Sequence, residues 1–340
     1  MKRLLLIAPV FFGYYKEMIR EAESLGYQVD YLCDAPSNSN ISKALGRINK
    51  RLISGAAKRY YKEQAFPLVN GNQYDTVLLV AGMTCAFSSE MFCQMRALQK
   101  KADFILYQWD SEVNLPYCRK IHPYFDRIYT FEKADSERDP IYHFMPTFYT
   151  RIYEQIGRKE RPEPRYDCSY VGTAHPKKYQ EINRMAEDLK AELPRQFIYH
   201  YIPSVLKYLY HKVTAKEYRH TRYRDFQKVK LSADDMMQMM EVSRCILDAP
   251  QGGQTGLTLR CLECLGAKRK LITTNADIVN YDFYRRSNIL VYPGTAEERK
   301  SFFENPYEEL PEELYRKYSL NSWMKQLLEN SESEKLPEKH

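Results

Sequence analysis

The segment from 247 to 275 combines residue types and spacings that suit the binding of a phosphate group. A short apolar run at 245–247 is followed by the glycine-rich turn PQGGQTG at 250–256 and then by a helical pattern. Such a turn presents unpaired backbone N–H groups and the positive end of the helix dipole to an anion. Arg260 and Glu263 stand three residues apart, so they lie on the same face of the predicted helix.

The glycines alone leave an alternative open. A GGxxG turn without a Walker lysine or a GxGxxG fingerprint occurs in many ordinary loops. The same residues are therefore also consistent with a tight turn between a strand and a solvated helix. With the apolar strand pattern at 270–274, the whole stretch is a βαβ unit under either interpretation.

Two carboxylates form a second group of candidate residues. Asp110 and Glu112 follow the apolar strand pattern at 104–107. Ligands of open parallel sheets lie beyond the carboxyl ends of the strands, so a carboxylate at this place can accept a proton from a substrate. Asp110 can equally cap a helix or organise a turn, and both roles stay open.

A parallel sheet is needed to position these residues, and the order of the apolar patterns predicts one. A strand at 4–11, a helix at 15–25 and a strand at 27–32 form a βαβ opening. The same rhythm continues along the first half of the chain and restarts near 166. We therefore predict an α/β protein with two doubly wound domains.

The domain boundaries follow from breaks in this rhythm. Pro162, Pro164 and a run of charges interrupt it between the two halves. The predicted organisation is a first domain at 1–150, a linker at 151–165, a second domain at 166–305, closing helices at 306–329 and a polar tail at 330–340.

The composition is typical of a globular protein. With 340 residues, of which 44% are hydrophobic and 28% charged, each domain can bury its own core. No apolar run approaches the ~20 residues of a membrane span. The opening MKRLLLIAPVFFG superficially resembles a signal peptide, but Pro9 interrupts the run and no cleavage site follows, which favours a buried strand.

Eight cysteines are scattered through apolar patterns, which favours reduced thiols in a cytoplasmic protein over a disulfide framework. Cys261 and Cys264 form a C-x-x-C pair. A zinc site needs a second pair of ligands and none stands nearby, so we expect buried thiols and no metal.

Two basic segments indicate contact with an anionic partner. The segment 41–64 has the pattern of an amphipathic helix with seven Lys or Arg residues. It is either a solvated face or a peripheral contact with an anionic membrane. The segment 207–230 mixes Lys, Arg, His and Tyr, which suits nucleic acid or lipid phosphate. It carries no motif for reading nucleic acid, so we expect no nucleic-acid partner. The apolar stripe of the first segment is Ile41, Leu45, Ile48, Leu52 and Ala56.

Four groups of residues, in their order along the chain, resemble one family of proteins. The groups are Trp109–Asp110–Ser111, then Phe125–Asp126 with Thr130–Phe131, then Tyr166 to Thr173 with His175–Pro176, and last Gln254 to Arg260 with Glu263. Together they resemble the GT-B-like glycosyltransferase proteins of bacterial capsule, exopolysaccharide and lipopolysaccharide biosynthesis, related to the CgeB group. The resemblance covers about residues 100–330, and the first hundred residues match in architecture alone.

The resemblance implies a fold and an activity. Two Rossmann-like domains would face each other across a cleft, with the acceptor on 1–150 and the nucleotide sugar on 166–305. The implied enzyme is a metal-independent hexosyltransferase without a cofactor. It would move a sugar from a nucleotide-sugar donor to a surface-polysaccharide or lipid-linked acceptor, at the inner face of the plasma membrane.

The resemblance also implies roles for individual residues. The donor-binding set would be Gly172, Thr173, Gln254, Thr255, Gly256, Arg260 and Glu263. Glu263 would accept hydrogen bonds from the ribose hydroxyls, while the glycine-rich turn and Arg260 would hold the diphosphate. Asp110 would act as the catalytic base, with Glu112 as the second candidate. Lys177 stands where the family often has an arginine.

Other functions remain open. Asp110-Ser-Glu112 also resembles the metal-binding D-x-D of GT-A transferases, although those enzymes usually lack a second βαβ half. A sugar-nucleotide epimerase or a polyol-phosphate transferase would have the same fold. A non-catalytic partner in glycan assembly would bind the nucleotide sugar without turnover.

Overall fold

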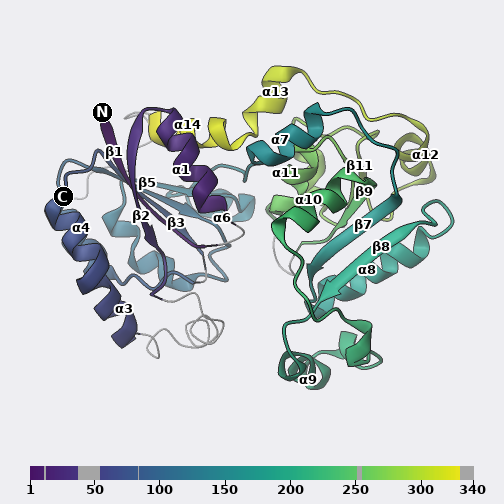
Figure 1. Ribbon diagram of the computed structural model, residues 1–340, viewed down its shortest axis with the longest axis horizontal. Coiled ribbons are helices and arrows are strands. Elements are labelled where there is room, and N and C mark those ends of the chain that lie inside the picture. Colours follow the sequence, from purple (N-terminus) through teal and green to yellow (C-terminus); the bar gives the residue numbers. More distant parts are fainter. Residues whose placement is uncertain (11–12, 37–53, 83, 251–254, 330–340) are drawn as a thin grey trace. The chain divides into compact units, whose positions relative to one another are not determined.

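The computed structural model describes the chain except for residues 11–12, 37–53, 83, 251–254 and 330–340. The described residues form two compact units. Unit 1 contains residues 1–146 together with the last helix, and unit 2 contains residues 147–319. Each unit is built on one parallel sheet with helices on its faces, so the predicted α/β class with two Rossmann-like, doubly wound domains is confirmed (Figure 1).

The sheet of unit 1 has the strand order β2-β1-β3-β4-β5-β6, with all pairs parallel. The central strands β1, β3 and β4 carry continuous apolar runs because both faces of the sheet are covered by helices there. The strands are β1 (Lys2–Ala8), β2 (Tyr27–Cys33), β3 (Thr76–Ala81), β4 (Asp103–Gln108), β5 (Arg127–Thr130) and β6 (His143–Phe144). The helices are α1 (Tyr14–Ser24), α3 (Ser54–Tyr60), α4 (Phe66–Gly71), α5 (Ser89–Leu98), α6 (Lys133–Arg138) and α14 (Leu320–Glu329).

The last helix of the chain belongs to the core of the first unit. Trp323 on α14 packs edge-on against Tyr107 of β4, with 4.7 Å between ring centroids. The Tyr27 hydroxyl donates to the carbonyl of Leu328 over 3.1 Å. Figure 1 shows α14 beside α1, and the contacts between these two helices agree. The opposite face of the sheet is covered by α3, α4 and α5.

The predicted basic helix at 41–64 falls partly outside the described residues. Its described part contains α3 and most of a π-helical turn at Tyr61–Ala65, and α4 continues the helix beyond the predicted end. Ala57, Tyr61 and Ala65 pack into the core. Of the predicted apolar stripe only Ala56 is described, and it is exposed. The inward face therefore lies one position further along the chain than the pattern predicted.

The sheet of unit 2 has the order β11-β10-β9-β7-β8, again parallel throughout. Helices α7, α10 and α11 lie on one face, and α8 and α12 on the other. The strands are β7 (Tyr166–Thr173), β8 (Gln196–Tyr201), β9 (Ser243–Asp248), β10 (Lys270–Thr273) and β11 (Ile289–Val291). The helices are α7 (Arg151–Arg158), α8 (Pro176–Asp188), α9 (Val205–Thr214), α10 (Ala233–Glu241), α11 (Leu259–Gly266), α12 (Ala296–Glu304) and α13 (Glu312–Lys317).

The second unit extends beyond the predicted boundaries at both ends. The segment expected to be a linker, 151–165, begins with α7, which packs tightly on α11. A Cβ atom on Gly157 would lie 2.2 Å from the carbonyl oxygen of Gly266, so only glycine permits this approach. The Tyr315 hydroxyl on α13 donates to the same carbonyl over 2.6 Å. Both flanking segments are thus part of the core of unit 2.

No helix among the described residues is long and apolar enough to span a membrane.

Candidate functional site

The carboxyl end of the sheet in unit 2 is organised around a buried carboxylate. Asp248 ends β9, and only 1% of it is exposed. The ammonium of Lys178, from the first turn of α8, lies 3.1 Å from Asp248 Oδ1, and the Thr258 hydroxyl donates to Oδ2 over 2.8 Å. Burial disfavours the charged ammonium, but Asp248 and Tyr170 together outweigh this effect and raise the pKa of Lys178. The lysine is therefore held as a cation at the end of β9.

A second cation comes from α11. Arg260 lies 3.4 Å from the Glu263 carboxylate and 3.5 Å from the carbonyl oxygen of Val171 near the end of β7. Both contacts are long for a guanidinium, which has five N–H donors in a fixed fork. Burial raises the pKa of Tyr170, and the positive charges of Lys178 and Arg260 each oppose this rise. Both cations are therefore close to the Tyr170 ring. The two cations therefore occupy one region of the sheet edge.

Glu263 is buried against the first helix of the unit. Its side chain is 5% exposed. Burial and the neighbouring Glu263 carboxylate raise the pKa of the Tyr153 hydroxyl on α7, which hydrogen bonds with that carboxylate. The predicted pair of Arg260 and Glu263 on one helix face is thus present, with Glu263 on the inner side.

The end of β7 approaches this region closely. A Cβ atom on Gly172 would lie 2.3 Å from the Tyr170 hydroxyl, so a larger residue there would displace the Tyr170 ring. The Tyr170 hydroxyl is buried, and no hydrogen-bond partner for it is found in the described part of the chain. Lys178 lies 5.9 Å from the centre of the same ring. Thr173, the last residue of β7, is exposed.

The glycine-rich turn is described only at its second half. Asn275, just after β10, donates from its side-chain amide to the carbonyls of Thr255 over 3.0 Å and Gly256 over 3.3 Å. These bonds tie the turn to the neighbouring strand end. Helix α11 begins at Leu259, with Thr258 before it. Gln254 and the preceding residues 251–253 lie outside the described residues.

Lys178 and Asp248 were not predicted as site residues. Lys177, which stands where the family often has an arginine, is exposed, whereas its neighbour Lys178 lies beside the buried carboxylate. A usable signal existed, because Lys178 precedes Ile182 and Met185 at helical spacing on the inner face of α8. A lysine on an apolar helix face needs a counter-charge or a ligand.

In unit 1 the two predicted carboxylates have different surroundings. Glu112 binds both Arg119 and Arg138, the latter over 2.7 Å, and accepts from the Tyr142 hydroxyl over 3.2 Å. The Arg119 guanidinium holds the pKa of Glu112 below its usual value. A carboxylate paired in this way is a weak base, so this environment favours a structural role for Glu112.

Asp110 organises a turn after β4. Its Oδ1 accepts from the Ser111 backbone N–H over 3.0 Å and from the Asn114 side-chain amide over 2.8 Å. This is the turn-forming role that the sequence left open beside the catalytic one. The same bonds fix the carboxylate at the carboxyl end of the unit 1 sheet, where ligands of such sheets lie.

No group of three or more potential metal ligands occurs among the described residues. Cys261 and Cys264 are unpaired with each other and buried on α11, and burial raises the pKa of both thiols. They are therefore apolar packing residues in the helix that carries Arg260.

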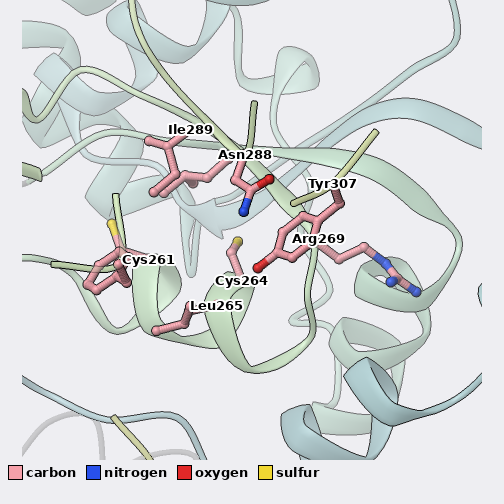
Figure 2. Close-up of a pocket in the computed structure, with 9 residues that line it drawn as sticks. Cys261, Cys264, Leu265, Arg269, Asn288, Ile289 and Tyr307 are labelled. Atoms are coloured by element: carbon pink, nitrogen blue, oxygen red, sulfur yellow. The ribbon is translucent and has the colours of Figure 1, made fainter. Parts of the chain in front are cut away.

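A small cavity lies elsewhere in unit 2. It is lined by α11 and by residues that precede β10 and β11, among them Arg269 and Asn288, so it belongs to the amino end of the sheet. Figure 2 shows the Tyr307 hydroxyl directed toward Cys264, and the Arg269 guanidinium pointing away. The volume of ≈ 10 Å³ is about that of one water and excludes a nucleotide sugar.

Comparisons with known proteins gave matches to solved structures alone. No family model and no curated protein matches the sequence. The UDP-GlcNAc 2-epimerase of Methanocaldococcus jannaschii aligns with 96% of this chain and 99% of its own, at 10% identity and a TM-score of 0.48. The Neisseria meningitidis UDP-GlcNAc 2-epimerase bound to UDP-GlcNAc aligns with 97% of this chain and 99% of its own, at 13% identity and a TM-score of 0.47. HepE from Anabaena in complex with UDP aligns with 96% of this chain and 95% of its own, at 11% identity and a TM-score of 0.47. Similarities of this size assign no function, and the fold rests on the strand order described above.

The contact of the half-buried Lys178 with the buried Asp248 predicts energetic coupling between them. Lys178→Met leaves the Asp248 carboxylate buried without its partner and should cost ~3–5 kcal/mol of unfolding free energy. Asp248→Asn leaves the half-buried ammonium of Lys178 without its counter-charge and should cost less. The double variant removes both charges and should cost less than the sum of the two by at least ~1 kcal/mol. Urea denaturation of the four proteins measures this cycle, and additive costs would show that the two charges do not interact.

The network around Glu112 predicts a pH-dependent contribution to stability. Because the folded-state pKa lies below the usual value, the contribution is present above that value and is lost as the pH falls through the folded pKa. Glu112→Gln should therefore lower the urea midpoint at pH ~7, and the difference from the parent should shrink at pH ~3. Glu137→Gln, at an exposed carboxylate of α6, is the control. A difference that is equal at both pH values would contradict the role of charge.

Proposed function

We propose that this chain is a glycosyltransferase that moves a sugar from a nucleotide-sugar donor to a surface-polysaccharide or lipid-linked acceptor. The observation that carries the proposal is the pair of cations, Lys178 and Arg260, at the carboxyl end of a parallel sheet in unit 2. Ligands of doubly wound sheets lie at this edge. Two cations at this edge can neutralise the negative charge of a diphosphate.

Donor binding divides between three parts of the site. The diphosphate lies on Arg260 and Lys178, beside the N-terminus of α11, whose free N–H groups and dipole favour negative charge. The exposed Thr173 gives the donor a contact at the end of β7. Glu263 accepts from the ribose hydroxyls after its carboxylate turns from the long contact with Arg260.

The transfer breaks the bond between the anomeric carbon and the diphosphate oxygen. The electron pair of that bond leaves with the nucleoside diphosphate, where Arg260 and Lys178 stabilise the developing charge. An acceptor hydroxyl oxygen forms the new bond to the anomeric carbon and gives up its proton. Asp110 is the proposed base, since Glu112 is held by two arginines. The charge balance requires no metal, and we propose that the reaction takes place at the inner face of the plasma membrane.

Product analysis tests this function against an epimerase and against a binding protein without turnover. A thermal-shift panel of UDP-, GDP-, CMP- and dTDP-sugars first identifies the donor, since a ligand at ~100 times its dissociation constant stabilises by about 2.7 kcal/mol. We expect release of nucleoside diphosphate that accelerates with a glycan or lipid-linked acceptor and survives excess EDTA. Conversion of the donor into its epimer without acceptor would contradict the proposal, as would binding without any product. Strict dependence on Mn²⁺ or Mg²⁺ would contradict the metal-free chemistry.

The donor site also predicts the effect of one substitution. Glu263→Gln keeps the size of the side chain but weakens its hydrogen bonds to the ribose, which should reduce donor affinity by roughly ten- to a hundredfold. Glu187→Gln, at an exposed position of α8, is the matched control. Titration calorimetry measures both affinities, and circular dichroism confirms the fold. Unchanged affinity in a folded Glu263→Gln protein would refute the ribose contact.

A further inference from the structure

Helix α9 presents an apolar face to solvent. Leu206 is 78% exposed, Leu209 49%, Tyr210 60% and Val213 87%. Their spacing of three, four and seven residues places all four on one side of the helix. Six of the eleven exposed large apolar side chains among the described residues lie between 205 and 229. A concentration of this kind marks an interaction surface rather than scattered surface residues.

The opposite side of α9 is held in place by packing. Tyr208 and His211 are buried in this helix, and Tyr208 contacts Tyr218 and Phe226 in a small aromatic core. The Ser204 hydroxyl caps the helix by accepting from the Lys207 N–H over 3.2 Å. The outward apolar face is therefore part of a folded element whose inner face is already occupied.

The segment that contains this face is strongly basic. Residues 204–230 contain eight Lys or Arg and two Asp or Glu, so this segment carries nearly all of the net charge of +7. Most of these basic residues are exposed, and no ion pair of the described residues engages a Lys or Arg between 204 and 228. Lys207 lies over the ring of Tyr210, at 5.6 Å from its centre, next to the apolar face.

We propose that α9 and the basic residues of 204–230 bind the surface of an anionic lipid membrane. The four apolar side chains enter the boundary between headgroups and acyl chains, and the cations contact lipid phosphates. A nucleic acid offers no counterpart for the aliphatic residues. A second copy of the chain would bring together two surfaces of the same charge. Charge and apolarity together therefore select the membrane.

The segment that carries α9 is attached at the carboxyl end of the unit 2 sheet, where the candidate site lies. The segment leaves the sheet of unit 2 at the carboxyl end of β8 and returns there, where the Ile202 N–H donates to the Gln227 carbonyl over 2.9 Å. Tyr179, the neighbour of Lys178 on α8, packs on Phe226 with 4.9 Å between ring centroids. Figure 1 shows α9 beyond this end of β7 and β8. The membrane-binding segment and the candidate site thus share one edge of the same sheet.

Flotation of the full-length protein with lipid vesicles tests the proposal. We expect binding to vesicles with ~30% anionic lipid, little binding to purely zwitterionic vesicles, and weakening as salt rises. Leu206→Ser combined with Val213→Ser should raise the lipid concentration for half-binding at least ~10-fold, because both side chains lose their apolar contact. Arg222→Gln combined with Arg224→Gln should weaken binding to anionic vesicles alone. All four positions are exposed, so circular dichroism should be unchanged.

Matched variants separate this surface from others. Val113→Ser changes a 77% exposed valine of unit 1 and should leave binding unchanged. Lys58→Gln combined with Arg59→Gln changes the basic helix of unit 1 and should likewise leave binding unchanged. A Tyr210→Trp reporter should shift its emission to the blue with vesicles and be quenched by brominated lipids. Binding that is unaffected by the α9 variants would overturn the proposal, as would no binding at low salt. Binding of duplex nucleic acid or self-association through these residues, without vesicle binding, would also overturn it.

Discussion

The buried carboxylate of Asp248 is the constraint on which the site of unit 2 depends. A carboxyl group with 1% exposure must be paired and hydrogen bonded, because its desolvation otherwise costs several kcal/mol. Lys178 supplies the charge from α8, and Thr258 supplies a hydrogen bond from the residue before α11. The amino ends of two helices are thereby fixed at the carboxyl end of β9. This arrangement presents a cation and a helix N-terminus at the sheet edge where doubly wound proteins bind ligands.

The packing of α11 adds a second constraint. The glycines at 157 and 266 let α7 approach this helix closely, and Tyr153 on α7 meets Glu263. The segment expected to be a linker is therefore a structural support for the helix that carries Arg260. The aromatic core under α9 reaches the same region through Tyr179. The proposed donor site and the proposed membrane contact thus depend on adjacent parts of one sheet edge.

Much of this fold follows from short-range patterns in the sequence. Apolar runs separated by helical patterns predicted both parallel sheets, because strands buried on two faces carry continuous apolar residues. The pairing of Arg260 with Glu263 followed from helical spacing alone. The partnership of Lys178 with Asp248 joins residues 70 positions apart, and no local pattern reports such a distance. The glycine contacts between α7 and α11 and the exposed side of α9 also depend on tertiary packing, so sequence periodicity did not show them.

The most direct test of the central claim compares ligands that differ by one phosphate. The cations Lys178 and Arg260 are proposed to hold the diphosphate of a nucleotide sugar, so the affinity should depend on its second phosphate. Titration calorimetry of the preferred nucleotide should show the nucleoside diphosphate binding at least ~10-fold more tightly than the monophosphate. In Arg260→Gln this difference should largely disappear while the fold is kept. Equal affinities for the two nucleotides in the parent protein, or an undiminished difference in the folded variant, would contradict the assignment of this edge as the diphosphate site.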